Sequence, residues 1–142
     1  MKKVTFLFAM LIIFLLAGCG NDAGVEEEID YETYRDTINS EEFTGFTYLL
    51  RTFRAEDGNY ISDMESVFNN SNEQLYYINM QTIDDEVRDN YNEDSRNMDL
   101  YFPADRVAYI EDGHVIDEFE VSDDIHSSGH NNDLANFIQM YQ

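Results

Sequence analysis

The sequence predicts an α/β domain built on a mixed β-sheet that is flanked by helices. Helical and strand patterns alternate through the first two thirds of the chain, which is typical of parallel strands joined by helical crossovers. Further on, two strand patterns meet at an Asp-Gly pair, which indicates an antiparallel hairpin. The predicted order is α, β, α, β, α, β, β, α, so a parallel core is expected beside a C-terminal antiparallel hairpin.

The first predicted helix spans 29–39, because aromatic and aliphatic residues recur there at helical spacing. The segment 43–53 is rich in Phe, Thr, Tyr and Leu, which predicts a strand. On that strand Phe46, Tyr48 and Leu50 share one face. This face is expected to meet the core.

A loop at 54–59 follows, as its Asp-Gly-Asn content indicates. The apolar stripe of 60–69 predicts a second helix. The continuous apolar and aromatic run at 74–81 predicts a strand that is buried on both faces.

A third helix is predicted over 83–92, with three acids near its start, where the helix dipole favours negative charge. Arg88 follows Asp84 by four residues, a spacing at which the two side chains can pair. The polar segment 92–97 is predicted to be a loop.

The hairpin is predicted to consist of strands 107–110 and 114–121, joined by a turn at 111–113. The segment 122–132 is predicted as a polar loop. Apolar residues then recur at i, i+3, i+4 and i+7 within 134–141, so the chain is expected to end in an amphipathic helix.

Four segments stand in the order first central strand, second central strand, hairpin and closing helix: EEFTGFTYLLRTF, EQLYYINMQ, RVAYIEDGHVIDEF and LANFIQMY. In this order the chain resembles the thioredoxin-like fold over residues 30–141. The one proline, Pro103, precedes the hairpin, where that family places a cis-proline that faces the active site.

The resemblance implies a site between the first central strand and the next helix, where the family carries Cys-x-x-Cys. Position at a helix N-terminus lowers the pKa of the attacking thiol, and the second thiol resolves the mixed disulfide. Here the junction 54–60 contains no cysteine. The chain therefore resembles a degenerate, redox-inactive member, as in some small Gram-positive lipoproteins and bacteriocin-associated accessory proteins.

The single cysteine lies near the N-terminus. Two lysines precede an apolar run at 4–16, which is short for a membrane-spanning helix and typical of a secretory signal peptide. The run ends in Leu-Ala-Gly-Cys, which resembles the lipobox of bacterial lipoproteins. The resemblance implies that Cys19 carries a diacylglycerol and becomes the first residue of the mature chain.

This predicts a signal peptide at 1–18, a lipidated acidic tether at 19–28 and a thioredoxin-like domain at 29–142. The expected location is the extracytoplasmic face of a Gram-positive-type cell membrane. The mature chain keeps six arginines and 30 acids, hence a formal net charge of −24. Such a chain has no basic face for nucleic acid or for docking by charge on an anionic membrane. A cationic protein or peptide is the expected partner.

The candidate binding surface joins the loop after the first central strand to the loop before the hairpin, because the resemblance implies that they meet. Its residues are Glu56, Asp57, Asn59, Tyr60, Phe102 and Pro103. His126 and His130 have a spacing that suits a metal on a helix, but Ser-Ser-Gly between them indicates a loop. No metal site, cofactor or catalytic constellation is predicted.

The leading hypothesis is therefore a non-enzymatic, membrane-anchored binding module. One alternative is an accessory or immunity factor, linked to thiol redox chemistry or to a bacteriocin, that works with a partner protein. Another is the precursor of a pheromone released from the signal peptide.

Overall fold

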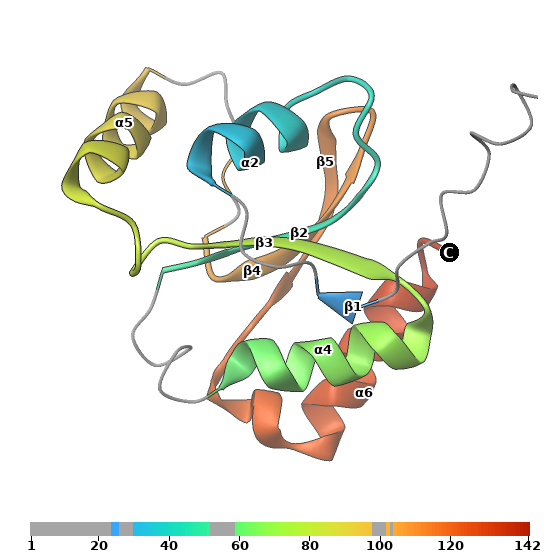
Figure 1. Ribbon diagram of the computed structural model, residues 1–142. Helices are drawn as coiled ribbons and strands as arrows, with labels where there is room; N and C mark the ends of the chain where they lie inside the picture. Colours follow the sequence, from blue (N-terminus) through green and yellow to red (C-terminus); the bar gives the residue numbers. More distant parts are fainter. Residues whose placement is uncertain (1–23, 26–29, 52–58, 98–101, 103) are drawn as a thin grey trace, which may run out of the picture.

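The computed structural model describes residues 24–25, 30–51, 59–97, 102 and 104–142 (Figure 1). These residues contain one five-stranded sheet in the order β1-β3-β2-β4-β5. The first three strands in that order run parallel, and β4 is antiparallel to both β2 and β5. The strands are β1 (Gly24–Val25), β2 (Gly45–Leu50), β3 (Gln74–Asn79), β4 (Arg106–Glu111) and β5 (His114–Glu120).

Helices cover both faces of this sheet. Figure 1 shows α2 and α5 on one side and α4 and α6 on the other. The helices are α2 (Tyr31–Ile38), α4 (Tyr60–Ser71), α5 (Asp85–Arg96), the 3₁₀-helix η1 (Asp123–His126) and α6 (Ser128–Gln139). The predicted α/β class, with a parallel core, a C-terminal antiparallel hairpin and flanking helices, is confirmed.

Strand β2 lies at the centre of the sheet and contributes to two cores. Phe46, Tyr48 and Leu50 point to the side of α4 and α6, as the alternation in the sequence predicts. On that side the ring of Phe46 meets Phe68 of α4 and Phe137 of α6, with centroids 5.5 and 6.0 Å away. Aromatic rings in edge-to-face contact supply much of the burial that holds these two helices to the sheet.

The opposite face of β2 packs under α2. Leu49 belongs to the second core together with Tyr34 and Ile38 of α2. Thr47 is also fully buried there, and its hydroxyl donates a hydrogen bond to the Tyr34 hydroxyl over 2.7 Å. A buried hydroxyl needs such a partner, so this bond fixes how α2 sits on the sheet.

Strand β3 is less buried than predicted. Leu75 and Ile78 are buried on opposite faces, whereas Tyr76 and Tyr77 between them are only half-buried. On its outer edge β3 is paired, among the described residues, only with β1. Because β1 is two residues long, it covers only the beginning of that edge.

The hairpin is confirmed, with a tighter turn than predicted. Glu111 pairs with His114, so the turn consists of Asp112 and Gly113 alone. Both have positive φ angles, 50° and 72°, which is the geometry of a type I′ turn. The register shifts beside Tyr109 and forms a β-bulge.

Three boundaries differ from the predictions. The segment 92–97, predicted as a loop, continues α5 as far as Arg96, and much of the predicted loop 122–132 is helical. Both segments are too polar for a burial pattern to reveal a helix. The segment 19–28, predicted as a tether, contains β1. A strand of two residues is too short to show a periodicity, so the sequence did not predict it.

The predicted partner of Arg88 is also wrong. The carboxylate of Asp84 instead accepts a hydrogen bond from the Val87 N–H and caps α5. The guanidinium of Arg88 pairs with Asp85, with 3.3 Å between Nη1 and Oδ1. No helix within the described ranges has the length and apolarity that a bilayer crossing requires.

Candidate functional site

Of the predicted site residues, only three lie in the described part of the chain. Cys19, Glu56, Asp57 and Pro103 fall outside it, so the structure does not place the lipid attachment point or the predicted cis-proline. Asn59, Tyr60 and Phe102 are described, together with the ends of the strands around them.

At this end of the sheet the segment before the hairpin contacts the end of β2, whereas residues 54–58 of the predicted loop lie outside the described part of the chain. Ala104, just before the hairpin, forms a parallel bridge with Leu49 of β2. The Asp105 N–H donates to the Leu49 carbonyl oxygen over 2.8 Å. The Asp105 carboxylate in turn accepts a hydrogen bond from the Arg51 N–H over 3.0 Å. The segment before the hairpin therefore lies against the carboxyl end of β2.

The side chains, however, do not form the single predicted surface. Tyr60 begins α4 and packs into the core beneath that helix, where its hydroxyl donates to the Asp123 carboxylate. Phe102 packs into the core on the opposite face, with its ring 6.0 Å from Tyr31 and 5.4 Å from Tyr91. The sheet therefore separates Tyr60 from Phe102. Spacing in the sequence does not show on which side of a sheet each loop leaves.

The histidines are engaged in contacts with the protein. His126 in η1 pairs through Nδ1 with the Asp63 carboxylate of α4. The ring of His130, in the first turn of α6, lies 4.9 Å from the ring of Phe119. Within the residues that the structure describes, no three side chains of His, Cys, Asp or Glu are grouped so that they could hold a metal ion.

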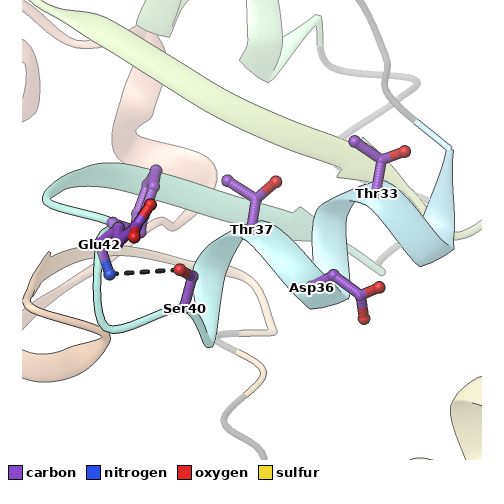
Figure 2. A pocket seen from close by; sticks show the side chains of 6 residues that line it. Thr33, Asp36, Thr37, Ser40 and Glu42 are labelled. Atoms are coloured by element: carbon purple, nitrogen blue, oxygen red, sulfur yellow. Dashed lines mark hydrogen bonds between the residues drawn. The ribbon is translucent and has the colours of Figure 1, made fainter.

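A broad hollow of about 520 Å³ lies beside α2 (Figure 2). It is open to solvent, and Figure 2 shows Thr33 and Thr37 projecting from the same side of the helix, one turn apart. At its other end the Ser40 hydroxyl accepts the Glu42 N–H over 3.2 Å. The lining residues are Thr33, Asp36, Thr37, Ser40, Glu42 and Phe43. Two carboxylates and three hydroxyls make this hollow suited to a basic side chain.

A second hollow, of about 330 Å³, lies where β2 and β3 end and α5 passes over them. Ligands of open α/β sheets usually bind beyond the carboxyl ends of the parallel strands, which is this position. Its lining residues are Arg51, Met80, Gln81, Arg88, Tyr91 and Asn92. We refer to it as the arginine hollow.

The wall of the arginine hollow is built from the strand ends. The Met80 N–H donates to the Leu50 carbonyl oxygen over 2.9 Å, so the pairing of β2 and β3 continues to this point. Gln81 then turns its side-chain Nε2 to the Arg51 carbonyl oxygen, 3.2 Å away. These bonds hold Arg51 and Gln81 at neighbouring positions.

The roof of the arginine hollow is α5, which is attached to the domain by few contacts. None of its residues is buried, and Val87 and Tyr91 are half-buried against the core under α2. Asp94 accepts hydrogen bonds from the Tyr31 hydroxyl, at 2.7 Å, and from Arg35, at 3.2 Å. Burial, reinforced by the bond to Asp94, raises the pKa of Tyr31 well above its usual range. With so little apolar surface buried, α5 is expected to open at a low free-energy cost.

Comparison with protein families, with curated proteins and with solved structures finds no match to this chain. The site must therefore be judged on its own chemistry. Sequence reasoning missed Arg51 and Arg88 as neighbours in one hollow. The available signal was their rarity, since each is one of only six arginines against 30 acids after residue 18.

Proposed function

We propose that this protein is a lipoprotein, anchored through Cys19 on the extracytoplasmic face of the cell membrane. Its domain is a redox-inactive, thioredoxin-like binding module for a cationic protein or peptide. One observation carries the proposal: the only thiol of the chain lies in a lipobox-like motif. The domain then has an attachment point but no thiol for exchange chemistry.

The position of β1 supports a fixed orientation on the membrane. Gly24 lies five residues after Cys19, and a fully extended chain of that length reaches about 18 Å. Gly24 pairs with Gln74, at the amino end of β3. Under this proposal the amino ends of the parallel strands lie near the lipid, and their carboxyl ends face away from it.

The charge and the hollow beside α2 support a basic partner. The thirty acids after residue 18, 26 of them in the domain at 29–142, create a negative potential that accelerates encounters with cationic molecules at low salt. In the hollow, Glu42 supplies a carboxylate near the hydroxyl of Ser40, and Asp36, which pairs with Arg35 at 2.8 Å, supplies a second one. A lysine or arginine side chain of a partner would find both charge and acceptors there.

The anchoring is tested by a Cys19→Ala variant expressed in a Gram-positive host. The variant should move from the membrane fraction to the medium, and globomycin should block processing of the natural chain but not of the variant. Circular dichroism of both should be the same, since Cys19 precedes the domain. Unchanged membrane retention of the variant contradicts the lipid anchor.

The partner class is tested by measuring the affinity for a short oligolysine peptide at several salt concentrations. The affinity should fall as salt rises, and it should fall further when Asp36→Asn and Glu42→Gln are combined. A matched control combines Glu65→Gln and Asp89→Asn, which removes two exposed charges outside this hollow. Equal losses in both double variants would assign the binding to overall charge and contradict the hollow as the docking site.

A further inference from the structure

We propose that the arginine hollow binds the carboxylate of a small organic acid that also carries an apolar group and a hydrogen-bond donor. An N-acylated amino acid or the C-terminal residue of a peptide has this chemistry. The proposal concerns a different hollow from the one beside α2, and it does not depend on the lipid anchor or on a cationic partner.

The charge of the lining is the first argument. The arginine hollow has two guanidinium groups and no carboxylate among its lining residues. Four other hollows lined by described residues each contain at least one Asp or Glu. In a chain with 30 acids and eight basic residues, an anion should meet less repulsion in this hollow than in the other four.

The pairing state of the two arginines is the second argument. Arg88 pairs with one exposed carboxylate, Asp85, at 3.3 Å, and its Nη2 donates to the Ile83 carbonyl oxygen over 3.5 Å. Arg51 makes no side-chain ion pair or hydrogen bond within the described residues. Its backbone is held at both ends, by Asp105 and by Gln81. A guanidinium on a fixed backbone and without a carboxylate partner is suited to bidentate recognition of an oxyanion.

A buried acceptor at the same wall specifies a further feature of the ligand. Gln81 donates from Nε2 to the Arg51 carbonyl oxygen, whereas its Oε1 is buried and has no hydrogen-bond partner among the described residues. Leaving a buried polar atom without a partner is costly, so a rotation of the Gln81 side chain that brings Oε1 to a ligand N–H or O–H in the hollow would recover free energy on binding. A carboxylate alone does not supply such a donor, and an acylated amino acid does.

The remaining wall and the volume of the hollow indicate that the ligand has an apolar group and a small size. Met80 is buried and Tyr91 is half-buried, so the wall between the polar groups is apolar and aromatic. The volume of about 330 Å³ lies at the lower end of the range for small-molecule sites, about 300–1,000 Å³. The hollow therefore fits a molecule of amino-acid size rather than an extended peptide.

Binding should also have a structural consequence. Arg51 follows β2, whereas Arg88 and Tyr91 belong to α5, the helix without a buried residue. A ligand that contacts both sides joins α5 to the sheet. The backbone amides of α5 should therefore exchange hydrogen more slowly in the complex.

The test uses the full lipidated protein in a neutral detergent, with N-acetylphenylalanine as the probe and isothermal titration calorimetry as the measurement. N-acetylphenylalanine should bind, whereas its primary amide, which lacks the carboxylate charge, should bind at least tenfold more weakly. Inorganic phosphate should bind more weakly than N-acetylphenylalanine, since it lacks the apolar group. Equal binding of the amide or of phosphate would overturn the assignment.

Arg51→Gln and Arg88→Gln should each weaken N-acetylphenylalanine binding by about tenfold and abolish the slowed exchange in α5. The matched control is Arg106→Gln, because Arg106 is exposed, pairs with Glu118 and lies outside the hollow. It removes the same charge and should leave the affinity unchanged. An equal loss in Arg106→Gln, or no loss in Arg51→Gln with unchanged thermal stability, would overturn the proposal.

Discussion

The hydrogen bond between Thr47 and Tyr34 is expected to be a main determinant of how α2 is held on the sheet. Both residues have no exposed surface, and the Thr47 hydroxyl donates to the Tyr34 hydroxyl over 2.7 Å. Thr47→Val keeps the shape of the side chain and removes the donor, so the Tyr34 hydroxyl stays buried without its partner. Leaving a buried hydroxyl unsatisfied costs about 1–3 kcal/mol of unfolding free energy.

Tyr34→Phe should cost a similar amount, since it leaves the Thr47 hydroxyl without an acceptor. In the double variant both polar groups are gone, and the loss should be smaller than the sum of the two single losses by about 1 kcal/mol or more. This coupling between the two sites measures the bond itself, separately from any change in packing.

Tyr48 provides a matched control within the same strand as Thr47. It is also fully buried, but its hydroxyl has no hydrogen-bond partner in the described part of the chain. Tyr48→Phe removes a buried polar group without breaking a bond, so it should leave stability unchanged or raise it by about 1 kcal/mol.

The assay is urea unfolding of the Cys19→Ala chain followed by circular dichroism, with the slope m compared between variants. An unchanged m assigns the shift in midpoint to stability alone. The reasoning is refuted if Tyr34→Phe and Tyr48→Phe shift the midpoint equally, or if the effects of Thr47→Val and Tyr34→Phe simply add.

Two further predictions concern the turn and the response to pH. Gly113→Ala should destabilise the domain by about 1–3 kcal/mol, because φ is 72° and a Cβ would lie 2.6 Å from the Ser40 carbonyl oxygen; an unchanged urea midpoint contradicts this. Burial raises the pKa of three tyrosines well above the ordinary value of 10, so the stability linked to their protonated form is complete below pH 10 and is lost as the pH rises beyond it. When the pH is raised, tyrosine absorbance at 295 nm should therefore show that these three side chains ionise only as the domain unfolds. Normal titration of all ten tyrosines would refute the burial argument. The three are Tyr31, Tyr34 and Tyr48.

Short-range patterns predicted several elements correctly, both where one face is buried, as in α4, and where both faces are buried, as in β2. The apolar stripe of α4, the alternation along β2 and the Asp-Gly turn all led to elements of the correct type. Prediction failed where polarity masks structure, as in the second half of α5, which has no buried residue to produce a stripe. It also failed for β1, whose pairing with β3 depends on a partner 50 residues away.

The candidate site was likewise only partly predictable from the sequence. Sequence reasoning placed it at the loop after the first central strand, most of which lies outside the described residues; the described Arg51 N–H, just before that loop, donates to the Asp105 carboxylate. It grouped Tyr60 with Phe102, which the sheet separates. It did not group Arg51 with Arg88, because 36 residues lie between them in the chain and only the packing of α5 over the strand ends makes them neighbours.

The sequence by itself determined the α/β class, the acidic character of the chain and the presence of a single thiol within a lipobox-like motif. These properties depend on composition and on short-range patterns. Only the tertiary structure decided which face each loop residue joins, how the strands are ordered and which hollow is free of carboxylates. Those properties depend on contacts between residues far apart in the chain, and local propensity carries no record of such contacts.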